Sequence, residues 1–155
     1  MTEPRIEHKD KFLAVGTRYF GKNENGEIGV MWKNDFLPRL NEIDADPSHG
    51  CVSYGICHCT NSPEGFEYLA ALAAKSLDSI PEGMVGWEIA ENTYAVFTSH
   101  GLAELGGLYN AVYNEWFPNS QEYERAEGYV FELYPETYNS DESTLYLYFP
   151  IKKKA

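Results

Sequence analysis

The stretch Tyr129–Tyr134 carries the side chain in this sequence that is best placed to do chemistry. Glu132 is its one charged residue, and the residues around it are aromatic or apolar. Aromatic and β-branched residues between a glycine and a proline predict a strand, and alternation puts Val130, Glu132 and Tyr134 on one face. Glu132 then either faces solvent on an antiparallel sheet or lines a pocket. In a pocket, desolvation would raise its pKa and suit it to cation binding or proton transfer.

Other chemistries find weaker support in the sequence. The run Cys57-His58-Cys59 places its two thiols on one face of a predicted strand and the imidazole on the other, and no second cluster completes a zinc site. No partner base marks a nucleophilic cysteine, and phosphate-loop, nucleophile-elbow and dinucleotide motifs are missing. We therefore expect no metal and no cofactor.

Composition narrows the class of protein. The 155 residues have a net charge of −12, with 43% hydrophobic and 15% aromatic residues. This charge argues against direct nucleic-acid binding, which needs clustered Lys and Arg. Three cysteines form no disulfide framework, and no signal sequence or membrane-length apolar run is present. We expect one cytoplasmic domain over residues 1–155, a monomer or weak dimer with no membrane partner.

The predicted elements follow the same order twice. Strands are predicted over 12–20, 52–60, 87–98 with a break, 129–134 and 145–151, and helices over 28–43, kinked at Pro38, and 105–117. Residues 66–77 fit a helix or a strand, and the repeat favours a strand. Two pseudo-repeats, about 1–80 and 81–155, then predict an α+β fold of duplicated βαββ units. Their strands would form one antiparallel sheet with both helices on one face, the other face concave and partly open.

The repeat and the alternation supply aromatic partners for Glu132. Tyr146 and Tyr148 share a face of the last strand, which can be the face that bears Glu132, and Tyr68 would match Tyr146 through the repeat. For each aromatic residue, core packing is the alternative. The candidate ligand-binding residues are Glu132, Tyr54, Tyr68, Trp87, Tyr134, Tyr146 and Tyr148.

Several pieces of the chain resemble GyrI-like effector-binding domains, which occur in AraC-type and MerR-type regulators and as free-standing proteins. They are residues 54–57, 66–71, 94–101, 113–120 (YNEWFPNS), 131–134 (FELY) and 147–152. The resemblance implies a duplicated βαββ fold whose cleft, between the halves, binds hydrophobic and often cationic small molecules, with Glu132 in the cleft. Two features depart from the family pattern: the sequence contains no helix-turn-helix segment, and Tyr146 stands where many relatives carry an acidic residue.

Three hypotheses follow for function. The first is sensing or sequestration of a hydrophobic, cationic or electrophilic compound in an aromatic cleft with Glu132 as the charge. The second, implied by free-standing relatives, is a hydrolase that opens cyclopropane rings of DNA-alkylating natural products. Glu132 would act as its general base or steer a water, and Tyr134 or Tyr146 would donate to the substrate. The third is an interaction protein that modulates a topoisomerase-like target through its acidic surface.

Overall fold

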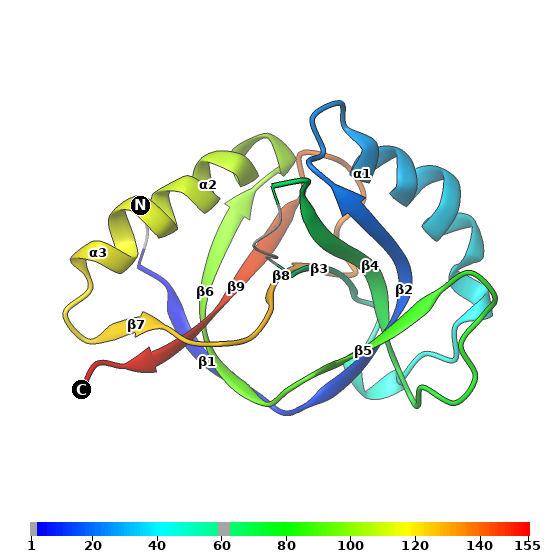
Figure 1. Ribbon diagram of the computed structural model, residues 1–155, viewed down its shortest axis with the longest axis horizontal. Helices are drawn as coiled ribbons and strands as arrows, with labels where there is room; N and C mark the ends of the chain where they lie inside the picture. The colour runs from blue at the N-terminus through cyan, green and yellow to red at the C-terminus, as the bar shows by residue number, and fades with distance from the viewer. Residues whose placement is uncertain (1–2, 59–62) are drawn as a thin grey trace.

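The computed structural model describes residues 3–58 and 63–155 (Figure 1). Its strands are β1 (Arg5–Lys9), β2 (Phe12–Gly21), β3 (Ser53–His58), β4 (Phe66–Ala74), β5 (Val85–Ile89), β6 (Asn92–His100), β7 (Tyr123–Arg125), β8 (Val130–Tyr134) and β9 (Thr144–Lys153). The first helical region joins α1 (Glu27–Met31) to a π-turn (Trp32–Phe36) and a 3₁₀ segment (Leu37–Glu42). The second joins a 3₁₀ turn (Leu102–Glu104), α2 (Leu105–Ala111), a π-turn (Val112–Trp116) and α3 (Phe117–Asn119). A short 3₁₀ turn, Pro47–His49, precedes β3.

The strands form one antiparallel sheet in the order β1-β6-β9-β8-β3-β4-β2-β5, with β7 paired to β9 beside this path. The order is symmetrical about the central β8–β3 pair. The predicted α+β fold is therefore confirmed, and residues 66–74 are the strand that the internal repeat favoured. β4 pairs with both β2 and β3, so it lies inside the sheet, where its alanines are buried.

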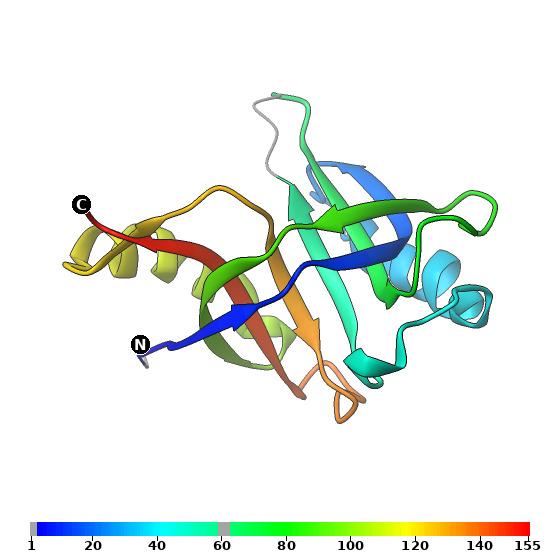
Figure 2. The same cartoon turned by 90° about the horizontal axis from the view of Figure 1, so that it is seen from below.

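Each half gives its first strand to the edge of the other half. β1 pairs with β6, while β5 pairs with β2. β1 and β2 are separated by two residues, as are β5 and β6, so each pair is one long strand with a break. Figures 1 and 2 show β1 and β5 passing beneath the centre of the sheet to reach the opposite sides.

Both helical regions contain a π-turn that ends two residues before a proline. Residues 34–38 (NDFLP) and 114–118 (NEWFP) occupy equivalent places in the two regions. A proline inside a helix lacks an N–H donor, and its ring clashes with the carbonyl four residues earlier, which accounts for the widened turn before it. The predicted division of the first helix at Pro38 is confirmed, because the helix becomes 3₁₀ from Leu37.

Both helical regions cover one face of the sheet, as predicted. On that face, Phe36 and Met31 of the first region pack over β2 and β4, whereas Val112 and Phe117 of the second pack over β6 and β9. Figure 1 shows the two regions side by side above the sheet, diverging from its centre.

The opposite face was predicted to be partly open, and this prediction is wrong. There the curled sheet encloses a third core, in which Phe131 stacks on Tyr148 at 4.5 Å and meets Tyr54 edge-on at 5.5 Å. Aromatic side chains fill the concavity, because the crossing β1 and β5 segments curl the sheet over them. Space for a ligand remains on the helix side, between the two helical regions. Within the described residues, no helix has the length and apolar character needed to cross a membrane.

Candidate functional site

Glu132 lies at the centre of the sheet on the helix-covered face. Its neighbours across β8 are Gly55 on β3 and Leu147 on β9, and the residue is 6% exposed. A Cβ atom at Gly55 would collide with the Tyr68 hydroxyl and with Glu132 Oε1. Glycine at this position therefore makes room for the carboxylate and its partner.

Three tyrosine hydroxyls donate hydrogen bonds to the Glu132 carboxylate. Oε1 accepts from Tyr134 at 2.6 Å and from Tyr68 at 3.0 Å, and Oε2 accepts from Tyr109 at 3.0 Å. Trp32 Nε1 in turn donates to the Tyr68 hydroxyl at 3.1 Å. Because the indole N–H can only donate, Tyr68 accepts that bond and directs its own proton at Glu132. Donors from β4, β8 and the second helical region therefore meet at a single carboxylate, and Trp32 of the first helical region supports one of them through Tyr68.

Burial and hydrogen bonding act in opposite directions on Glu132. Desolvation raises the pKa of its carboxyl above the ordinary glutamate value, while the hydrogen bonds from Tyr134, Tyr68 and Tyr109 partly offset this effect. Burial and the nearby carboxylate also raise the pKa of Tyr68 and Tyr134. These tyrosines stay protonated near neutral pH and act as donors.

The carboxylate lines a pocket of about 500 Å³ between the halves. Six aromatic side chains, drawn from both halves, form much of its wall: Trp32, Phe66, Tyr68, Tyr109, Tyr113 and Tyr134. Among the described residues that line it, Glu132 is the one charged side chain, and none is Lys, Arg or His. The arrangement can hold an apolar group with a positive charge, because aromatic faces and a carboxylate both attract cations.

The structure brings Tyr68 and Tyr134 to Glu132 and places the other predicted site residues elsewhere. Tyr54 is buried on the opposite face, where its hydroxyl meets His49 Nδ1 at 3.0 Å. On that same face, Tyr148 donates to Glu7 and the Tyr146 ring lies 5.2 Å from the Arg5 guanidinium. The Trp87 ring stacks on Tyr129 at 5.4 Å, also outside the pocket lining.

The predicted shared face of Tyr146, Tyr148 and Glu132 is wrong because of strand register. Leu147 stands opposite Glu132, so the two tyrosines beside it point to the other side of the sheet. The same register also corrects which residues of the two repeats correspond to each other. Ala70 pairs with Gly55 as Leu147 pairs with Glu132, so Tyr68, two residues before Ala70, corresponds to Leu145 and not to Tyr146.

Two residues of the hydrogen-bond network, Trp32 and Tyr109, were not predicted, because the apolar spacing of both helices indicated core packing. Trp32 begins the π-turn of the first region, and Tyr109 lies on α2. The available signal was that both aromatic residues end in a polar atom, which needs a partner when it is buried. The partner is the Tyr68 hydroxyl for Trp32 and the Glu132 carboxylate for Tyr109.

The Cys57-His58-Cys59 run is only partly described. Cys57 lines the pocket, with its Sγ 3.7 Å from the Tyr109 hydroxyl. His58 is exposed and lies 3.6 Å from a Glu67 oxygen. Cys59 lies outside the described residues.

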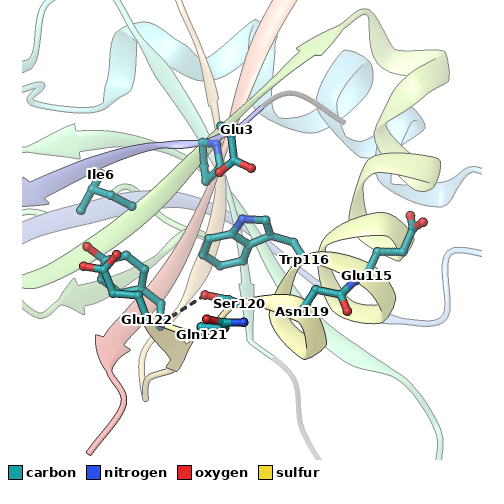
Figure 3. A pocket seen from close by; sticks show the side chains of 10 residues that line it. Glu3, Ile6, Glu115, Trp116, Asn119, Ser120, Gln121 and Glu122 are labelled. Atoms are coloured by element: carbon teal, nitrogen blue, oxygen red, sulfur yellow. Dashed lines mark hydrogen bonds between the residues drawn. The ribbon is translucent and has the colours of Figure 1, made fainter.

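A larger hollow of about 590 Å³ lies between the N-terminal segment and the end of the second helical region. Figure 3 shows Trp116 within it, near Glu3, Ser120 and Asn119. The carboxylates of Glu3, Glu115 and Glu122 are exposed there, so water already solvates them. We place the candidate site at Glu132 because its charge is desolvated.

Residues 5–151 match the sequence model of a protein family described as integron-associated effector-binding proteins. The transcriptional regulator BrlR of Pseudomonas aeruginosa is 34% identical over 154 aligned residues, covering 95% of this chain and 54% of BrlR. The chain thus spans about half the length of this curated relative.

Solved structures share the fold. SAV2435 bound to tetraphenylphosphonium aligns with a TM-score of 0.76 and 16% identity, over 97% of this chain and 94% of that one. The C-terminal domain of EcmrR gives a TM-score of 0.72 at 14% identity, with 98% of each chain covered. The Vibrio cholerae integron cassette protein VCH_CASS2 gives 0.65 at 20% identity, with 97% of each chain covered.

Proposed function

Since this chain belongs to the integron-associated effector-binding proteins, a GyrI-like family whose members bind small molecules, we propose that its ligand is a lipophilic cation held at Glu132. Binding would serve to sense or to sequester the compound. The observation that carries this proposal is a desolvated carboxylate in an aromatic pocket whose described lining contains no basic side chain.

A cationic ligand would supply the charge that the free pocket lacks. Burying an ionised carboxylate is costly unless an opposite charge or hydrogen bonds compensate it. The three tyrosine donors compensate in part, yet the pKa of Glu132 remains raised. A cation against the carboxylate would lower this pKa again, and the surrounding rings would add cation–π attraction of about 0.5–2 kcal/mol per contact.

The overall charge and the structural relatives point in the same direction. The net charge of −12 favours approach of cations over anions. SAV2435, which has the same fold, was solved with tetraphenylphosphonium. We therefore use tetraphenylphosphonium as the probe for this chain.

Isothermal titration calorimetry with tetraphenylphosphonium and with neutral triphenylphosphine oxide tests the proposal. We expect the cation to bind wild type, and the Glu132→Gln variant to bind it at least tenfold more weakly, equivalent to about 1.4 kcal/mol. The neutral compound should bind the two proteins with nearly equal affinity, since its binding does not depend on the Glu132 charge.

Glu127→Gln is the matched control, because Glu127 is exposed and lines neither this pocket nor the hollow of Figure 3. It removes the same net charge without touching the site. Equal affinity of wild type and Glu132→Gln for the cation would exclude Glu132 from the site. If Glu127→Gln lost as much cation affinity as Glu132→Gln, the effect would come from the net charge of the protein and not from the site.

A further inference from the structure

A second hollow of about 510 Å³ adjoins the Glu132 pocket. We name the Glu132 pocket the inner compartment and this hollow the outer compartment. The two share four wall residues, Gly29, Trp32, Leu102 and Tyr134. The Trp32 and Tyr134 rings meet edge to face at 5.2 Å and form part of the wall common to both compartments.

The outer compartment presents apolar surface to solvent. Leu37 is 47% exposed and Leu102 is 39% exposed, and both line it. Tyr138 adds a ring that meets Tyr134 edge-on at 4.9 Å. Large apolar side chains gathered in one hollow favour an apolar occupant, because covering them removes apolar area from water.

Gly29 lies at the junction of the two compartments, since it lines both of them. It is exposed in the first turn of α1, and a Cβ atom added there would meet no heavy atom within 4 Å. Close packing therefore does not require glycine, which is less favourable in a helix than alanine. Gly107 on α2 is likewise exposed with open space around it, but it lines neither compartment.

We propose that the outer compartment is a second ligand subsite, and that the ligand is an elongated cation. Its charged, aromatic end would occupy the inner compartment beside Glu132. A tether would pass over Gly29, and a second aromatic group would lie against Leu37 and Tyr138. This inference rests on the proposed function, because it extends a ligand that is already held at Glu132.

Three triphenylphosphonium probes test the inference in calorimetric titrations of the whole chain. The methyl derivative fills the inner compartment, the butyl derivative adds a tether, and the 4-phenylbutyl derivative adds a second ring at the end of that tether. We expect the phenylbutyl probe to bind wild type about tenfold more tightly than the butyl probe. The measured quantity is this ratio of dissociation constants on one protein, so changes confined to the inner compartment cancel.

Two variants should abolish the ratio, each with a matched control. Gly29→Leu fills the junction, and Leu37→Asn removes apolar wall from the outer compartment. Gly107→Leu and Val30→Asn make the same changes at exposed positions that line neither compartment. We expect a ratio near one in the first pair and near ten in the controls.

The outcomes separate this inference from the proposed function. If the methyl probe binds and loses affinity in Glu132→Gln, but the phenylbutyl probe gains nothing over butyl on wild type, the second subsite is refuted while the first stands. A tenfold ratio that survives in both Gly29→Leu and Leu37→Asn would place the extra ring elsewhere and also refute it. If no phosphonium binds wild type, the proposed function fails and the inference falls with it.

Discussion

Removing the Tyr134 hydroxyl should raise the pKa of Glu132 in the free protein. Tyr134 makes the shortest hydrogen bond to the carboxylate, 2.6 Å to Oε1, and this bond favours the ionised form. A hydrogen bond to a charged group contributes about 1.5–3 kcal/mol. One pKa unit corresponds to about 1.4 kcal/mol, so we expect Tyr134→Phe to raise the pKa by about 1–2 units.

The phenylalanine ring preserves the packing of the site. Tyr134 touches Trp32 and Tyr138 through its ring, and these contacts survive loss of the hydroxyl. Tyr68 and Tyr109 still donate to the carboxylate, which favours the lower end of the range. Tyr138→Phe is the control, because its hydroxyl is not one of the three donors to Glu132.

Carbon-13 NMR of the glutamate side-chain carboxyl groups measures this pKa directly, with Glu132→Gln to assign the signal. Cation affinity gives an independent reading, since binding that needs the ionised carboxylate should weaken at a higher pH in Tyr134→Phe than in wild type. A pKa in Tyr134→Phe equal to or below that of wild type would refute the assigned network. A comparable rise in Tyr138→Phe would attribute the effect to altered packing.

Three further predictions follow. The raised pKa of Glu132 means that its contribution to stability is present below the ordinary glutamate pKa and is lost as pH rises through the folded-state value. The free energy of unfolding of Glu132→Gln relative to wild type, from urea titrations, should therefore be higher at pH 8 than at pH 4, and a constant difference would contradict this. Tyr148→Phe should leave tetraphenylphosphonium affinity within twofold of wild type by calorimetry, because Tyr148 lies on the opposite face; a tenfold loss would argue against the inner compartment as the site. Gly16→Ala should destabilise by about 3 kcal/mol or more in urea titrations, since its Cβ would collide with the Ala70 carbonyl. Gly107→Ala, with open space around the new Cβ, should instead stabilise by about 0.5–1 kcal/mol, and equal effects would contradict the packing argument.

The sequence was informative where local pattern and fold agree. Apolar spacing predicted both helices, the aromatic stretch around Glu132 predicted β8, and the repeat identified residues 66–74 as β4 despite their helix-favouring alanines. Tyr134 was found because alternation within one strand fixes its face relative to Glu132.

The register between neighbouring strands could not be predicted from the sequence pattern in the same way. The faces of Tyr146 and Tyr148 depend on whether Leu147 or a neighbour stands opposite Glu132, and a shift of one residue reverses the answer. Tertiary packing of the helices over the sheet brings Tyr109 to the carboxylate and Trp32 to the Tyr68 hydroxyl. Helical spacing alone does not distinguish a side chain in the core from one in a pocket that borders the core.

The exchange of edge strands between the halves has a consequence for how the chain unfolds. Cutting the polypeptide near residue 80 would leave each fragment with a border strand that belongs to the other, β1 to β6 and β5 to β2. Neither fragment could form all the strand pairs of its half of the sheet. When the two fragments are produced separately, we therefore expect folded protein only after they are mixed. These pairings join the two halves at both edges of the sheet, so we expect the halves to unfold together as one unit.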